Sequence, residues 1–224
     1  PVSKSSLSKE AMNQFQISKN KVKYLPNVID RLFLETPKKY ILPKEITDLK
    51  GSFNILFTGN ISEAQSLNTV LDSAEILLQN GHNNINYVIV GSGSKLEELE
   101  HQKEKRNITN VFFTGAFPLD HMPSFIKFSD ALLILLKDEV IFNQTIPNKL
   151  QSYLASGKPI IGSIGGEGAR VIKDSAGGLV SLPEDSSSLA NQSIALSRLN
   201  KNELNKFSIN SLKYFQKNFS EEVF

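Results

Sequence analysis

Short apolar segments alternate with amphipathic segments from residue 51 onward, and this alternation limits the possible folds more than any other feature of the sequence. The apolar segments are rich in Val, Ile, Leu and Phe on both faces, which is typical of buried parallel strands. We predict strands at 53–58, 87–90, 111–114, 131–136, 159–162 and 178–182. We predict helices near 65–79, 95–106, 121–128, 147–156, 169–174, 186–199 and 201–217. The pattern predicts an α/β fold with a Rossmann-like, doubly wound parallel sheet of about six strands.

Residues 1–50 do not share this alternation. A short amphipathic helix is expected near 5–16 and a strand at 22–25, while Pro37 and Pro43 are typical of a linker. Two interpretations remain open for this segment: an appendage of the main domain, or the tail of a preceding domain. Because the chain does not begin with Met, we expect a fragment of a longer protein.

The composition excludes several kinds of site. Without cysteine, the chain can form neither disulfides nor Cys-ligated metal centres. His82, His101 and His121 stand apart from one another, and no Asp-x-Asp motif occurs, so we expect no metal cofactor. The net charge is only +2 and no dense Lys/Arg block is present, so nucleic acid is not an expected partner.

Small or polar residues follow the predicted strands at their carboxyl ends, where open parallel sheets bind ligands. These are Gly59 and Asn60, Gly91 to Gly93, Gly115 to Phe117, Lys137 to Glu139, and Gly162 to Gly168. Glycines at one edge of a sheet allow the backbone to approach a ligand closely. The alternative is that strand-to-helix turns use glycine for their own geometry. We predict a ligand cleft at this edge.

Segment 143–169 has the features of an anion site. Gly165 and Gly166 precede a helix expected near Ala169, so that backbone N–H groups could face an anion. Lys149 lies in the first turn of another predicted helix, where a cation opposes the helix dipole. An anion between Lys149 and the helix would explain its position, and the alternative is a solvent-facing lysine.

Other nucleotide and nucleophile motifs are incomplete. Gly91-Ser92-Gly93 begins like a dinucleotide fingerprint, but Leu96 replaces the third glycine and Val111 stands where an acid is needed. The sequence contains neither a P-loop nor a Gly-x-Ser-x-Gly elbow.

Four segments in order resemble the family 4 glycosyltransferases: GNISEAQSL, YVIVGSGSKLEEL, VFFTGAFPLDHMPSFIKFSDALLILLKDE and TIPNKLQSYLASGKPIIGSIGGEGARVIKDSAGGLV. These are two-domain GT-B enzymes, and the resemblance is strongest to N-acetylfucosaminyl transferases of bacterial capsule and O-antigen assembly. It implies that 51–200 is the nucleotide-sugar-binding domain in the C-terminal half. Residues 1–50 would be the end of the acceptor domain and the interdomain linker, which VKYLPNVIDRLF resembles, and 201–224 a C-terminal helix.

The resemblance also implies donor-binding positions. Where the family often carries an Arg and a Lys for the donor diphosphate, this chain has Asn60 and Gln65. Two family glutamates correspond to Gln144 and Ser152, with Glu139 as a displaced first acid. Lys149 is then the expected diphosphate contact. The other implied donor-binding residues are Gly59, Gly91, Gly93, Phe117, Gly165, Gly166 and Glu167.

The implied reaction is transfer of a sugar from a nucleoside diphosphate, expected to be UDP, with retention at the anomeric carbon. No catalytic residue is identified, and the charge of the leaving diphosphate would be stabilised by helix N-termini and Lys149 without a metal. The acceptor, a saccharide or lipid-linked saccharide, would bind the other half. The whole enzyme would be cytoplasmic or peripheral at the inner membrane face, and this chain alone inactive.

Two further interpretations stay open. A sugar-nucleotide epimerase half would need catalytic acids, for which only Asp138, Glu139 and Glu167 are candidates. A non-catalytic α/β binding domain would bind no nucleotide.

Overall fold

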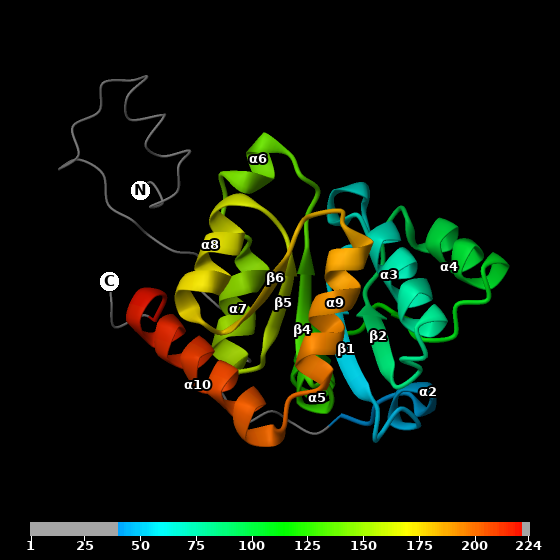
Figure 1. Ribbon diagram of the computed structural model, residues 1–224, viewed down its shortest axis with the longest axis horizontal. Helices are drawn as coiled ribbons and strands as arrows, with labels where there is room; N and C mark the ends of the chain where they lie inside the picture. Colours follow the sequence, from blue (N-terminus) through cyan, green and yellow to red (C-terminus); the bar gives the residue numbers. More distant parts are fainter. Residues whose placement is uncertain (1–39, 221–224) are drawn as a thin grey trace.

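The computed structural model describes residues 40–220, so the helix and strand expected before residue 26 lie outside the described part. Its centre is a sheet of six parallel strands in the order β3-β2-β1-β4-β5-β6 (Figure 1). The strands are β1 (Phe53–Thr58), β2 (Ile85–Val90), β3 (Val111–Gly115), β4 (Ala131–Leu135), β5 (Ile160–Ser163) and β6 (Gly178–Ser181). This confirms the predicted α/β class and the doubly wound sheet.

Helices connect successive strands, and others precede β1 or follow β6. They are α2 (Lys44–Thr47), α3 (Asn68–Gln79), α4 (Leu96–Lys105), α5 (Met122–Phe128), α6 (Val140–Asn143), α7 (Asn148–Ser156), α8 (Gly166–Ser175), α9 (Ser186–Ser197) and α10 (Lys201–Asn218). Two short 3₁₀ turns, η3 (Glu63–Gln65) and η4 (Leu119–His121), precede α3 and α5.

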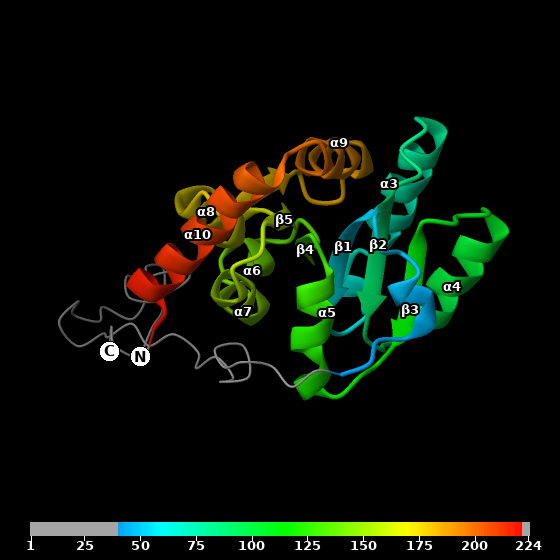
Figure 2. The same cartoon turned by 90° about the horizontal axis from the view of Figure 1, so that it is seen from below.

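The two faces of the sheet bury separate apolar clusters, as the alternation of side chains along a strand requires. Ile55 and Phe57 of β1 pack on the side of α3 and α9. Leu56, between them, packs on the opposite side with residues of α5, α7, α8 and α10. Figure 2 shows the sheet between α9 and α5. Burial on both faces explains why the strands are apolar throughout.

The direction of winding reverses between β1 and β4. The chain proceeds outward from β1 to β3 and then returns to place β4 on the other side of β1. Because the connections leave in opposite directions, the carboxyl ends of β1 and β4 lie side by side at the position where doubly wound sheets have their ligand crevice. In Figure 1 these ends point toward the upper edge of the sheet.

Three sequence expectations are corrected. No helix was predicted between the strand at 131–136 and the helix near 147–156, but this segment contains α6, whose four residues are too few to show a helical period. Helix α8 begins at Gly166 rather than near Ala169, because Gly165 already has the extended conformation of an N-cap. Helix α3 begins at Asn68 rather than near residue 65, because η3 ends at Gln65 and its C-cap residue Ser66 has a positive φ of 47°.

Candidate nucleotide site at the carboxyl edge of the sheet

A pocket with a volume of about 400 Å³ opens at the carboxyl ends of β1, β2 and β3. Its walls come from the three strand-to-helix connections and the start of α5. The lining residues are Thr58, Gly59, Asn60, Val90, Gly91, Ser92, Ala116, Phe117, Leu119 and Met122. The volume is in the range of small-molecule sites. The pocket lies at the carboxyl edge of the sheet, on the β2 and β3 side of the switch point between β1 and β4.

Gly59 and Gly91 line the floor of the pocket, and Gly93 lies just outside the lining. Gly91 has a φ of +155°, and a Cβ built there would lie 1.8 Å from the carbonyl oxygen of Gly59. A Cβ on Gly93, with a φ of +159°, would lie 2.2 Å from the carbonyl oxygen of Ile61. The loops after β1 and β2 therefore touch through their main chains, as glycine alone permits.

One wall of the pocket is apolar and aromatic. Phe117 packs edge-on against Phe125, with 5.0 Å between ring centroids, and lies 5.8 Å from the ring of His121. Leu119 and Met122 continue this wall. A flat, partly apolar group such as a nucleobase suits a surface of this kind.

Lys149, at the start of α7, reaches from the other side of the crevice toward the end of β1. Its Nζ lies 3.8 Å from the centroid of the Phe57 ring, and a Cβ on Gly59 would lie 2.7 Å from it. Its side chain is partly buried, and none of the ion pairs among residues 40–220 includes it. Burial lowers the pKa of Lys149 to about 7. A desolvated lysine of this kind gains free energy from an incoming anion.

Tyr153 fixes the distance between α7 and β1. It lies one helical turn after Lys149, and its hydroxyl accepts a hydrogen bond of 3.1 Å from the backbone N–H of Thr58. The two hydroxyls of Tyr153 and Thr58 are 3.2 Å apart. Burial raises the pKa of Tyr153 to about 12, so the phenol stays neutral. Through this contact α7 holds Lys149 beside the pocket.

The N-terminus of α8 is packed closely by α6. A Cβ on Gly165 would lie 2.3 Å from Oδ1 of Asn143, and one on Gly166 would lie 1.9 Å from the carbonyl oxygen of Asn143. Because Gly165 and Gly166 have no side chains, α6 can pack directly on the start of α8. Glu167, in the first turn of α8, forms an ion pair of 2.7 Å with Arg170.

The structure brings only some of the predicted donor-binding residues together. Gly59, Asn60, Gly91 and Phe117 line the pocket, and Lys149 lies beside it. The remaining residues lie elsewhere along the carboxyl edge, outside the pocket lining. These are Gln65 in η3, Gly93, Glu139 and Gln144 at the two ends of α6, Ser152 in α7, and Gly165, Gly166 and Glu167 at the start of α8.

Sequence reasoning missed several residues that line or position the pocket, among them Leu119, Met122 and Tyr153. Leu119, in η4, precedes the predicted helix at 121–128, and Met122 lies within that helix, where apolar residues indicate core packing. Tyr153 falls on the apolar face of α7 for the same reason. The spacing of Lys149 and Tyr153, four residues apart, was the available signal, since such residues share one helix face.

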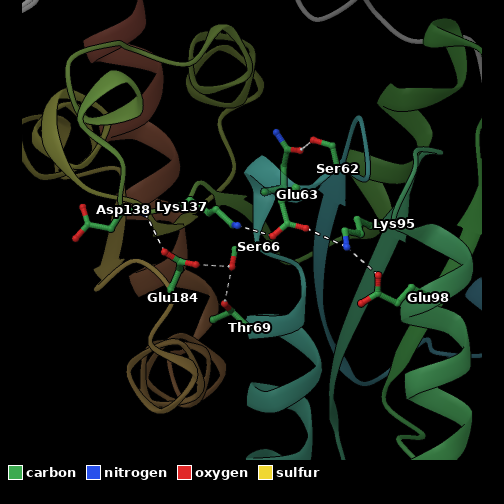
Figure 3. A network of polar contacts seen from close by, with 10 residues as sticks. Ser62, Glu63, Ser66, Thr69, Lys95, Glu98, Lys137, Asp138 and Glu184 are labelled. Atoms are coloured by element: carbon green, nitrogen blue, oxygen red, sulfur yellow. Dashed lines mark hydrogen bonds and ion pairs between the residues drawn. The ribbon is translucent and has the colours of Figure 1, made fainter.

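A network of charged side chains crosses the same edge on the side of α3 and α9 (Figure 3). Glu63 forms ion pairs with Lys95, at 3.1 Å, and with Lys137. These contacts lower the pKa of Glu63, chiefly through the hydrogen bond from Lys137, and that hydrogen bond raises the pKa of Lys137. Glu184 accepts hydrogen bonds of 3.1 Å from Ser66 and from the backbone N–H of Asp138. The network joins the connections that follow β1, β2, β4 and β6.

Within residues 40–220, no group of three or more His, Asp or Glu side chains could hold a metal ion. In the same part of the chain, no helix has both the length and the apolar character needed to cross a bilayer.

Comparison with known families identifies the domain. The sequence profile of the family described as glycosyl transferases group 1 matches residues 42–214. The chain belongs to this family. The group 1 match spans all six strands and the pocket described above.

The relatives of this group 1 domain include longer proteins. It is 31% identical over 103 residues to WcaI of Escherichia coli (strain K12), whose name assigns it to colanic acid biosynthesis as a glycosyl transferase. That match covers 46% of this chain and 24% of WcaI, so the chain spans about a quarter of that relative.

Solved structures share the fold at low sequence identity. A point mutant of S. aureus TarM, crystallised with fondaparinux, alpha-GlcNAc-glycerol and UDP, superposes with a TM-score of 0.77 at 14% identity over 99% of this chain and 41% of TarM. Anabaena HepE in complex with UDP and glucose gives 0.75 at 16% identity, over 97% of this chain and 58% of HepE. The C-terminal domain of Francisella tularensis LpcC gives 0.63 at 18% identity, over 79% of this chain and 91% of that domain. The group 1 domain thus has the Rossmann-like half of the GT-B fold.

Proposed function

We propose that this domain binds the nucleoside diphosphate sugar donor of a retaining glycosyltransferase that builds bacterial surface polysaccharide. The observation that carries the proposal is the pocket at the carboxyl ends of β1 to β3, with Lys149 beside it and outside the ion pairs of the described residues. Membership in glycosyl transferases group 1 supports glycosyl transfer, and UDP in the crystals of TarM and HepE supports the donor class.

The pocket suggests how a donor would be arranged. The nucleobase would lie against Phe117, Leu119 and Met122, with backbone groups of the glycine loops at its edge. The diphosphate would then extend toward the crevice between β1 and β4, where Lys149 approaches Gly59. Bond cleavage leaves additional negative charge on the diphosphate. Lys149 and backbone N–H groups would stabilise this charge without a metal ion.

The sugar and the acceptor are proposed from the family resemblance and from the match to WcaI. The resemblance to N-acetylfucosaminyl transferases favours an N-acetylhexosamine donor, and the match to WcaI favours a role in capsule or O-antigen assembly. A saccharide or lipid-linked saccharide acceptor would bind another part of the enzyme, at the cytoplasmic face of the inner membrane. We therefore expect this chain alone to transfer little or no sugar.

Titration with UDP, GDP and ADP, followed by amide NMR shifts, tests the donor site. We expect saturable shifts with UDP in Gly59, Gly91, Phe117 and the first turn of α7, and weaker effects with the other bases. Absence of saturable shifts with all three nucleotides would contradict donor binding. Saturation by GDP or ADP in preference to UDP would correct the base while keeping the site.

The stereochemistry needs the full-length enzyme. Proton NMR of the first product formed from the nucleotide sugar reports the anomeric configuration. Retention is the expected result, and an inverted product would overturn that part of the proposal.

A further inference from the structure

Tyr40, which precedes the first strand by more than ten residues, is fixed against the segment that forms the aromatic wall of the pocket. Its hydroxyl donates a hydrogen bond of 2.5 Å to Oδ2 of Asp120, and its ring stacks on His121 with centroids 3.9 Å apart and planes inclined by 16°. Its backbone N–H donates to Oγ of Ser124 at 3.1 Å. One residue thus makes three different contacts with a segment about eighty positions later in the chain.

The same segment also contributes the aromatic wall of the pocket. The ring of His121 stacks on that of Tyr40, and its centroid lies 5.8 Å from that of the Phe117 ring. Leu119 and Met122, on either side of the contacted residues Asp120 and His121, both line the pocket. Tyr40 is not among the residues that line the pocket, so it supports this wall through its contacts with Asp120, His121 and Ser124.

This support matters because the segment is weakly buried before Met122. Ala116 and Pro118 are exposed, and Leu119 is 49% exposed. A segment with so few buried side chains depends on specific contacts for its position. Tyr40 supplies a hydrogen bond to the side chain of Asp120, a ring stack and a backbone contact together.

The contact is specific to Tyr40 and does not reflect general burial of its neighbours. Ile41 is 96% exposed, although it follows Tyr40 directly. Ile41, an exposed apolar residue next to Tyr40, is therefore the matched control position.

We propose that Tyr40 is a positioning residue for the nucleotide pocket, and that nucleotide binding and the docking of Tyr40 strengthen each other. The inference rests on the proposed donor site. If docking of Tyr40 favours the binding-competent position of Phe117 and Leu119, then by linkage a bound nucleotide favours docking of Tyr40 to the same extent.

The test compares UDP affinity in the wild-type chain and in Tyr40→Ala, Tyr40→Phe and Ile41→Ala. Loss of the aromatic contact should weaken UDP binding about twofold to tenfold in Tyr40→Ala. Tyr40→Phe keeps the stack on His121 and loses the hydrogen bond to Asp120, so it should restore part of the affinity. Ile41→Ala should match the wild type.

Hydrogen exchange separates positioning from a general effect on stability. In Tyr40→Ala we expect faster exchange in residues 116–124 and unchanged exchange in the central strand β1. In the wild type, UDP should slow exchange at residues 40–42. A uniform increase across the domain would indicate loss of stability and contradict a positioning role.

The outcomes distinguish this inference from the proposal beneath it. If the wild-type chain binds no nucleotide, the donor site and the coupling both fail. If the wild type binds UDP and Tyr40→Ala binds it equally well with unchanged exchange in 116–124, only the role of Tyr40 is overturned.

Discussion

The lysines at two parts of the carboxyl edge differ in their partners and in the direction of their pKa shifts. On the side of α3 and α9, Lys95 and Lys137 both pair with Glu63, and hydrogen bonds to carboxylates raise the pKa of each lysine. On the other side, Lys149 contacts the Phe57 ring, and burial lowers its pKa to about 7. The first group already has its counter-charges within the protein. Lys149 lies outside the ion pairs of the described residues, so its charge is available to a bound anion.

The difference separates a structural network from a candidate binding site, although both lie at the same edge. Exposed ion pairs contribute little to stability, and they bridge loops without leaving a cation available. A desolvated lysine costs free energy unless a ligand compensates it. Groups whose pKa is strongly shifted by burial, such as Lys149, are expected at functional sites.

The largest expected effect comes from closing the floor of the pocket with Gly91→Ala. The new Cβ would meet the carbonyl oxygen of Gly59 at 1.8 Å, at a backbone φ of +155°. We expect UDP binding to be lost and the free energy of unfolding to fall by about 2–5 kcal/mol. Calorimetric titration and urea denaturation measure the two quantities.

Gly81→Ala is the matched control for backbone strain, because Gly81 also has a positive φ, of +77°, but a Cβ at this position would have no other atom within 4 Å. It should lose some stability and keep UDP affinity. Equal affinity in Gly91→Ala and the wild type would show that the pocket is not the nucleotide site.

Lys149→Ala should have the next largest effect on binding. Removing a charge-assisted contact to a diphosphate should weaken UDP affinity on the order of tenfold to a hundredfold. Lys137→Ala removes a lysine of the paired group at the same edge and should change affinity by less than about twofold. If the two variants lose affinity equally, the distinction between the two groups of lysines is wrong.

The pH dependence of binding sharpens the same comparison. In the free domain Lys149 loses its proton above about pH 7, and a bound anion raises its pKa, so binding above pH 7 takes up a proton. UDP affinity should therefore fall as pH rises from 7.5 to 9, by at most about tenfold per pH unit. Lys149→Met should remove this slope, and a slope that persists in Lys149→Met must come from another group.

Lys149 also makes the free energy of unfolding depend on pH, and this dependence has the opposite sign to that of UDP affinity. The folded-state pKa of Lys149, about 7, lies below the ordinary value of 10.5, so the unfolded chain binds more protons between these values. The contribution of Lys149 to the free energy of unfolding therefore increases as pH rises from 7 toward 10. Comparison of urea denaturation of the wild type and Lys149→Met across this range measures it.

Glu63→Gln should have the smallest effect. It removes the carboxylate shared by Lys95 and Lys137, but all three side chains are partly exposed, with 61% of the Glu63 side chain in solvent. Solvent and salt screen such pairs, so UDP affinity should stay within about twofold of the wild type. A large loss of affinity would mean that the network, rather than Lys149 alone, supports the donor site.

The strand and helix order could be predicted from the sequence because it depends on local patterns. The predicted strand at 53–58 coincides with β1, and the predicted helix at 147–156 begins within one residue of α7. Apolar periodicity and the positions of Gly157 and Pro147 are sufficient for this. The short helix α6 was missed because four residues contain barely one turn.

The sequence by itself determined that this chain forms a doubly wound α/β domain with glycines at one edge, because period and backbone conformation are properties of neighbouring residues. Only the tertiary structure decided which edge residues face one pocket. Phe117, Leu119 and Met122 meet the glycine loops because β3, β2 and β1 are adjacent, and Lys149 reaches Gly59 because β4 returns to the side of β1. Tyr40 joins this wall across about eighty residues. Such contacts depend on how the strands are ordered in space, and no local pattern in the chain encodes that order.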